Sequence, residues 1–140
     1  MARKPKAIVL DSWSVLAYLE DEPAGETVAE IIADAHENSI ALIMSLVNVG
    51  EVWYIVARET SEKEADICID ELRHLGIAFV EIDWKLARQA ALFKSKHKMS
   101  FADCFAAALA KDQNAEVVTG DKEFKCVEKE VKINWLRHSN

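Results

Sequence analysis

The segment AIVLDSWSVLAYLEDEP, residues 7–23, sets the fold class. Its first four residues form a short, apolar, β-branched run, which is typical of a buried strand. Asp11 ends that run, and apolar residues then recur at helical spacing from Ser12 to Leu19, until an acidic pair and Pro23 interrupt them. A buried strand that leads through a single acid into a helix is the start of a βαβ unit in a parallel sheet.

The rest of the chain repeats this alternation. Apolar runs predict strands, and periodic segments, several of them behind a capping serine, predict helices. The predicted strands cover 40–44, 77–82, 116–119 and 131–136, and the predicted helices cover 24–35, 45–59, 61–76, 83–96 and 100–112. The sequence therefore predicts an α/β fold: one domain over residues 1–140, with a parallel sheet of four to five strands and helices on both faces. Ligands of such sheets bind outside the carboxyl ends of the strands.

Length and composition exclude several classes of protein. A chain of 140 residues with 51% hydrophobic and 29% charged residues is typical of one folded domain and not of a disordered protein. No stretch reaches the roughly 18 apolar residues of a membrane helix. The apolar run behind Arg3, Lys4 and Lys6 is too short for a signal peptide. The three widely spaced cysteines lack any metal or redox spacing, which favours reduced thiols in a cytoplasmic protein.

Four carboxylates stand out because of where they lie. Asp11, Glu51 and Asp103 are each the single charge within an apolar segment, at 7–19, 38–57 and 99–110, whereas a window of twenty residues is expected to hold about six charges at this composition. Asp121 lies two residues after the strand predicted to end at Thr119. Such acids are costly to bury unless they are paired or bind a metal.

A divalent cation is the simplest counterion for these acids, because no Lys or Arg lies inside the three apolar segments. Mg²⁺ or Mn²⁺ takes oxygen ligands and commonly bridges carboxylates to a substrate phosphate. The net charge of −7 supports the same idea. A nucleic acid is otherwise bound through Lys and Arg, so a nucleic-acid partner would require a local basic patch or a bound cation.

Each carboxylate also has a structural explanation. Asp11 is placed to cap the helix behind it, and Asp103 follows Ser100 at the spacing of a capping box. Glu51 is explained as half of a buried Glu–Arg pair, and Asp121 as an ordinary turn residue. We expect four unrelated structural carboxylates to be the less economical explanation of the set.

The chain resembles the PIN-domain nucleases, and among them the VapC-type toxins of toxin–antitoxin pairs. The resemblance is carried by four segments in the family's order and spacing: IVLDS at 8–12, NVGEV at 48–52, SFADCFAAA at 100–108 and VTGDKEF at 118–124. It extends over essentially the whole chain. Trp13 departs from the family pattern, in which a smaller residue is expected.

The resemblance implies a function and a set of site residues. Asp11, Glu51, Asp103 and Asp121 match the acids that hold Mg²⁺ or Mn²⁺, and Thr119 matches the hydroxyl residue that orients the last acid or a metal-bound water. Ser12 matches a small polar neighbour of the first acid. The family hydrolyses RNA phosphodiesters and leaves 5′-phosphate and 3′-hydroxyl ends. Similar members form homodimers and are inhibited by an antitoxin whose tail occupies the active-site groove.

A basic run lies just before the Ser100 segment and contains Lys94, Lys96 and Lys98. It is interpreted either as a solvated helix end or as a surface that steers RNA phosphates toward the site. Of the aromatic residues outside the first helix, Trp84 and Trp135 are expected in the core. Trp53 and Tyr54 are adjacent and cannot both face the same core, so one is expected at a dimer interface or in contact with a base.

Two other functions compete with a ribonuclease. A Mg²⁺-dependent phosphatase of the Asp-x-Asp type requires an acid where Trp13 stands, and a phosphotransfer receiver requires an acidic pair before Asp11. Neither accounts for Glu51 in the middle of a helix. The other alternative is a non-catalytic module that keeps the acidic pocket to bind an arginine-bearing partner.

Overall fold

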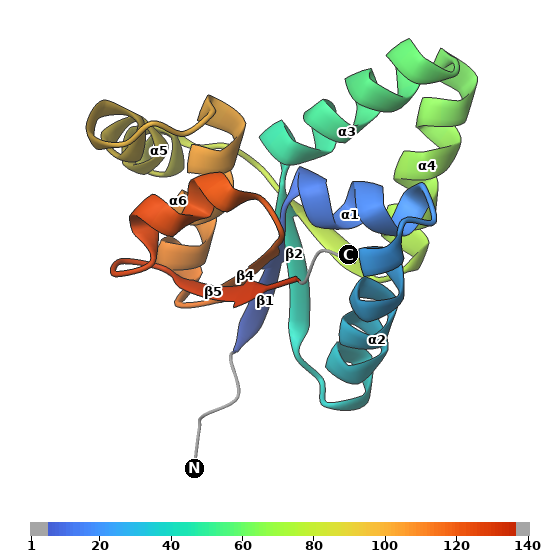
Figure 1. The fold of residues 1–140 in the computed structure, drawn as a ribbon, viewed down its shortest axis with the longest axis horizontal. Helices are drawn as coiled ribbons and strands as arrows, with labels where there is room; N and C mark the ends of the chain where they lie inside the picture. The colour runs from blue at the N-terminus through green and yellow to red at the C-terminus, as the bar shows by residue number, and fades with distance from the viewer. Residues whose placement is uncertain (1–5, 137–140) are drawn as a thin grey trace.

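The sheet confirms the predicted parallel α/β fold (Figure 1). In the computed structural model, which describes residues 6–136, five parallel strands lie in the order β3-β2-β1-β4-β5. The strands are β1 (Ala7–Leu10), β2 (Ala41–Ser45), β3 (Ile77–Val80), β4 (Glu116–Thr119) and β5 (Lys132–Trp135). The chain moves from β1 to β3 in one direction and then returns to the other side of β1, so the strand order reverses between β1 and β4. Ligands of open α/β sheets bind at such a switch point.

Helices cover both faces of the sheet (Figure 1). They are α1 (Ser12–Leu19), α2 (Pro23–Glu37), α3 (Leu46–Glu59), α4 (Glu62–His74), α5 (Trp84–Lys96) and α6 (Phe101–Gln113). Four of the predicted caps form: the side chains of Asp11, Ser45, Ser61 and Ser100 each accept a hydrogen bond from a backbone N–H in the first turn of α1, α3, α4 and α6. Gly76 ends the α4 region with a positive φ of 83°, a conformation that glycine adopts without strain.

Alternate residues of the strands build two separate cores. Val9 of β1 packs with residues of α5 and α6, whereas Ile8 and Leu10 pack with residues of α1 to α4. This division follows from the two-residue period of a strand, which sends successive side chains to opposite faces. Both cores consist of apolar side chains. The buried polar side chains Asp11, Ser45 and Thr119 lie instead where the strands end, at the carboxyl edge of the sheet.

Three features differ from the expectations of the sequence. Trp84 was expected in the core and is 74% exposed, because the buried residues of α5 are Leu86, Ala90 and Phe93, and a residue two positions before Leu86 lies on the opposite side of the helix. A short 3-10 helix, η1 (Lys122–Val127), lies in a segment for which the sequence predicted no helix or strand. Trp135 is only partly buried, and its indole N–H donates to Glu128 Oε2 (2.9 Å).

Two further expectations concern the chain as a whole. Among residues 6–136, the structure contains no helix that is both long and apolar enough to cross a membrane. The three cysteines are free thiols, as predicted. Arg3 and Lys4, which were considered with the signal-peptide question, lie outside the described residues.

Candidate active site

Asp11 lies at the switch point, where β1 ends and α1 begins. Its carboxylate is fully buried and accepts hydrogen bonds from the Ser14 backbone N–H (2.9 Å) and from the Thr119 hydroxyl at the end of β4 (2.5 Å). Burial raises the pKa of Asp11 from 3.8 to about 7, although these hydrogen bonds favour the charged form. Asp11 therefore caps α1, as predicted, and the same side chain also lies at the switch point between β1 and β4.

Thr119 contacts both the first and the last of the predicted acids. Its hydroxyl donates to Asp11 and accepts from the backbone N–H of Asp121 (3.0 Å), so it orients the first acid directly and fixes the main chain of the last. The Thr119 side chain is fully buried. One hydroxyl thus connects the loops that follow the two strands at the switch point.

Glu51 reaches the same edge of the sheet from α3. Its Oε1 accepts a short hydrogen bond from the Ser12 hydroxyl. Within residues 6–136 it forms no ion pair, so the buried Glu–Arg pair considered from the sequence does not occur. Ser12 is buried beside Asp11, and its contact with Glu51 connects α1 to α3.

Asn48 is a structural residue of the site that sequence reasoning missed. It is fully buried, and its side-chain Oδ1 accepts from the Ser45 hydroxyl (2.7 Å) while its Nδ2 donates to the Ala102 carbonyl (3.1 Å) and to Ser12 Oγ (3.4 Å). These bonds link the three helices α1, α3 and α6, each of which carries or follows one of the acids. Asn48 lies within the NVGEV segment, but nothing in its local pattern indicates these distant partners.

Asp103 lies in the first turn of α6, as predicted, but the capping box forms only in part. The Ser100 hydroxyl accepts from the Asp103 backbone N–H (3.1 Å), whereas the Ser100 backbone N–H donates to Glu123 Oε1 (2.9 Å) and not to Asp103. Glu123 therefore takes the role that a capping box gives to the third helical residue. The Asp103 carboxyl group is left free to face the groove.

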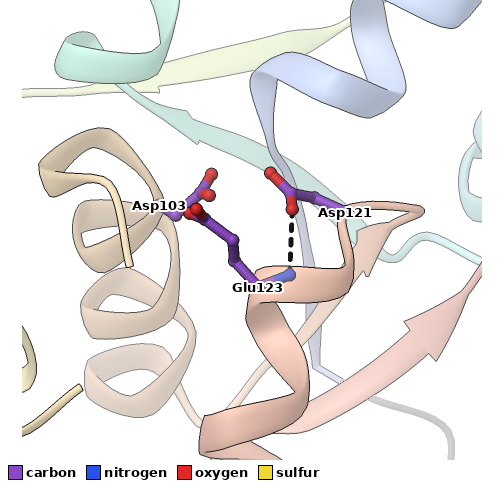
Figure 2. Close-up of side chains that lie close together, drawn as sticks. All are labelled: Asp103, Asp121 and Glu123. Carbon is purple, nitrogen blue, oxygen red and sulfur yellow. Dashed lines mark hydrogen bonds between the residues drawn. The ribbon is translucent and has the colours of Figure 1, made fainter. Parts of the chain in front are cut away.

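Asp103, Asp121 and Glu123 form the closest group of acids (Figure 2). One carboxylate oxygen from each lies within 4.8 Å of the others, and Figure 2 shows the three side chains converging from α6, from the turn after β4 and from η1. Asp121 Oδ1 also accepts from the Glu123 backbone N–H (2.9 Å), which fixes the turn. Glu123 was not among the predicted site residues, and Asp11 and Glu51 lie outside this closest group.

The crowding changes the protonation of these acids. Burial, together with hydrogen bonds and repulsion from the neighbouring acids, raises the pKa of Asp103 from 3.8 to about 9, whereas the Ser100 N–H and the Asp103 hydroxyl lower the pKa of Glu123. In the part of the chain that the structure describes, none of the five acids is ion-paired with a Lys, Arg or His. A proton on Asp103 therefore takes the place of a cation, and a set of hard oxygen donors without a positive partner fits Mg²⁺ or Mn²⁺.

The acids open onto one groove of about 320 Å³. Glu51, Asp103, Asp121 and Glu123 line its polar part together with Ser12 and Ser100, and Trp13, Leu16 and Ile55 form an apolar part beside them. Asp11 lies beneath the groove and contributes no lining surface, since it is fully buried. Four of the five acids therefore meet solvent in the same hollow.

The basic run lies near this groove only at one end. Lys94 donates to the Met99 carbonyl (2.6 Å) and lies close enough to Glu123 to lower its pKa. Lys96 and Lys98 are exposed and outside the groove lining. The structure thus brings Lys94 to the acidic cluster and leaves the other two lysines on the adjoining surface.

Comparison with known proteins agrees with this architecture. The family model for the PIN domain matches residues 8–130. A search of curated proteins gave no match. Among solved structures, the chain is similar to Mycobacterium tuberculosis VapC20, a sarcin–ricin loop cleaving toxin (TM-score 0.71, 18% identity, 86% of this chain and 95% of that chain). It is also similar to Rickettsia felis VapBC2 bound to a promoter DNA fragment (0.73, 14%, 94% and 99%).

A third similar structure is FitAcB from Neisseria gonorrhoeae, with a TM-score of 0.59 and 24% identity over 90% of this chain and 95% of that chain. At these identities the likeness establishes the fold alone. The family model, in contrast, spans the chain from β1 to β4, including the switch point and every acid of the groove. The chain therefore belongs to the PIN domain family.

Proposed function

We propose that the protein is a metal-dependent endoribonuclease that acts as the toxin of a type II toxin–antitoxin pair, with residues 1–140 forming one nuclease domain. The observation that carries this proposal is the convergence of Asp103, Asp121 and Glu123 in an open groove, where none of them forms an ion pair with a Lys, Arg or His among the described residues. A domain has little reason to gather such acids for stability, because their mutual repulsion and burial cost free energy.

We propose that the acids of the groove hold the metal. Asp103 and Asp121 would hold Mg²⁺ or Mn²⁺ together with Glu51, with Asp11 beneath them and Glu123 as a further ligand or a partner of Asp103. A bound divalent ion supplies an activated water and neutralises the charge that develops on a phosphate. Asp11 and Thr119 then hold the turn after β4 in place through their hydrogen bond, so that Asp121 stays oriented.

The remaining predicted residues would serve the substrate. The Ser12 hydroxyl lines the groove beside Glu51 and is available to a phosphate oxygen once it exchanges that partner. Lys94, Lys96 and Lys98 would attract the RNA backbone to the edge of the groove and offset, locally, the net charge of −7.

The biological role rests on the family and its structural relatives. Similar structures include a toxin–antitoxin complex from Klebsiella pneumoniae and VapBC-5 from Mycobacterium tuberculosis, a member of the VapBC family of toxin–antitoxin systems. We propose that this chain likewise has an antitoxin partner, forms a homodimer and acts in the cytoplasm. Tyr54 is 45% exposed on α3 while its neighbour Trp53 packs against the core, so Tyr54 is the one of the pair available to a dimer interface.

The proposal is tested by incubating the purified protein with a mixed, structured RNA pool in Mg²⁺, in Mn²⁺ and in EDTA. Asp11→Asn and Asp121→Asn serve as site variants, and Asp34→Asn, on the exposed surface of α2, serves as the matched control. We expect cleavage that requires metal, that falls at least about 100-fold in either site variant, and that is unchanged in the control.

A different outcome would point to the alternative function. If the protein binds a divalent ion by calorimetry but cuts no RNA with either metal, the groove would be a docking pocket for an arginine-bearing partner. Cleavage that persists in EDTA would contradict the metal site itself.

A further inference from the structure

We infer that Trp13 is a stacking surface for a nucleobase of the RNA, beside the acidic cluster and next to the phosphate that is cleaved. This inference rests on the proposed function and extends it to how the substrate is recognised. It also gives a role to the bulky residue that departs from the family pattern.

The position of the Trp13 ring is fixed by Gly120. A Cβ atom placed on Gly120 would lie 2.3 Å from Cη2 of the indole and 2.6 Å from both Cζ2 and Cζ3. Three adjacent ring atoms at nearly equal distances mean that Gly120 lies against the flat face of the ring and not against its edge. Only glycine permits this approach, so the backbone just before Asp121 holds the indole in a defined orientation.

The ring also lies in the right place relative to the acids. Trp13 follows Ser12, whose hydroxyl contacts Glu51, and it lines the same groove as Asp103 and Asp121. Leu16 and Ile55 continue the apolar wall on the side of Trp13. The indole is only partly buried, so part of its surface stays available in the groove.

The chemistry of a nucleotide matches these two halves of the groove. A metal held by the acids takes the phosphate, and the base attached to the neighbouring sugar requires an apolar, flat surface within reach. Trp13 is the one aromatic residue among the described residues that line the groove. Base–aromatic stacking contributes about 1–3 kcal/mol per base, and a rigidly held ring offers it with little loss of side-chain entropy.

The test compares Trp13→Ala, Trp13→Leu and Trp13→Phe, with Trp84→Ala as the control because Trp84 is an exposed indole on α5, outside the groove. Initial rates are measured on single-stranded oligoribonucleotides that span a bond cut by the unmodified protein, with a single abasic nucleotide moved along the strand. Binding of the same fluorescein-labelled strands is measured by anisotropy in Mg²⁺, in a Glu51→Gln background that leaves the closest acids intact.

We expect Trp13→Leu to weaken binding by about 10- to 100-fold and to raise KM, while Trp13→Phe retains most of the affinity and Trp84→Ala is unchanged. One abasic position should weaken binding to the Trp13 protein by a similar factor and should have no further effect on Trp13→Leu. Leu keeps the apolar volume and Phe keeps a ring, so this comparison remains informative even if Trp13→Ala unfolds.

Three outcomes would overturn the inference. The first is equal RNA affinity of Trp13→Leu and the unmodified protein. The second is an equal loss of affinity in Trp13→Leu and Trp13→Phe. The third is a further loss of affinity by Trp13→Leu wherever the abasic nucleotide is placed. Equal RNA binding would instead assign the apolar part of the groove to a protein partner. Absence of both cleavage and binding in the unmodified protein would reject the proposed function, which is a separate result.

Discussion

Replacing Asp103 with Asn should make the metal-free protein more stable, although it removes a group from the candidate active site. Asp103 is 6% exposed and its pKa is raised from 3.8 to about 9 by burial and by the neighbouring acids. At neutral pH the native protein therefore holds a proton on Asp103 that the unfolded chain has released. Asn has nearly the same shape as the protonated acid and carries no such penalty.

The size of the effect follows from the two pKa values. Below about pH 4 both states are protonated and the penalty vanishes; as the pH rises toward 9, the unfolded state is favoured by up to about 1.4 kcal/mol per pH unit. The upper bound at pH 7 is about 4 kcal/mol. Rearrangement of Asp121 and of the exposed Glu123 reduces this value, so we expect Asp103→Asn to gain about 1–2 kcal/mol, or about 3–6 °C in Tm.

The assay is thermal unfolding followed by circular dichroism at pH 5, 6, 7 and 8, in EDTA and in Mg²⁺. The difference between the variant and the unmodified protein should grow with pH in EDTA. Saturating Mg²⁺ should stabilise the unmodified protein, by about 2.7 kcal/mol at 100 times its Kd, and should leave Asp103→Asn nearly unchanged. The difference in Tm between Asp103→Asn and the unmodified protein should therefore become smaller or change sign when the metal is added.

Asp34→Asn, which removes an exposed acid on α2, is the matched control. Its difference in stability from the unmodified protein should change neither with pH nor with Mg²⁺. If Asp103→Asn is less stable than the unmodified protein at pH 7 in EDTA while the control is unchanged, Asp103 acts as an ionised helix-capping group. The reasoning about crowded acids would then be wrong.

Three other predictions test separate parts of the site. Glu51→Gln should abolish RNA cleavage with an unchanged circular dichroism spectrum; full activity would remove Glu51 from the site. Asn48→Ala should lower the free energy of unfolding by about 2–3 kcal/mol in urea, because it removes the side-chain hydrogen bonds to Ser45, Ser12 and the Ala102 carbonyl, whereas the exposed Asn38→Ala should change it by less than about 1 kcal/mol. Lys96→Ala and Lys98→Ala should each reduce the slope of log affinity for RNA against log salt by about 1 if they contact phosphates, and a slope that does not change would make them solvated surface residues.

The order of strands and helices followed from local patterns. Most strands are short apolar runs, and every helix except α2 begins behind a side chain that accepts a hydrogen bond from its first turn, so neighbouring residues alone carried enough information to predict them. The edge of the sheet that holds the site also followed, because parallel strands end on one side. Asp11, Glu51 and Asp103 were recognisable as candidates because each is the single charge in an apolar segment, and Asp121 was recognisable because it follows the end of a predicted strand.

Local pattern was insufficient where a residue's role depends on a partner far along the chain. By local sequence Glu123 is one more acid in a charged turn. It enters the cluster only because the segment after β4 packs against the start of α6, where the Glu123 carboxylate accepts a hydrogen bond from the Ser100 N–H. Asn48 is likewise defined by contacts with Ser12 and Ala102. The prediction for Trp84 was wrong for a different reason. It relied on the hydrophobicity of the side chain and not on the helical period, which places Trp84 opposite the buried residues of α5.

The sequence by itself thus determined the α/β class, the carboxyl edge of the sheet as the place of the site, and the acids that belong to that site. These depend on the polarity of individual residues and on hydrophobic periods of two residues in strands and about 3.6 residues in helices. Only the tertiary structure decided which oxygens meet, that Glu123 frees Asp103 from the helix cap, and that Trp13 lies flat on Gly120. These are matters of side-chain placement within a few ångströms between segments up to about 110 residues apart, and such distances are set by the packing of the whole sheet and its helices.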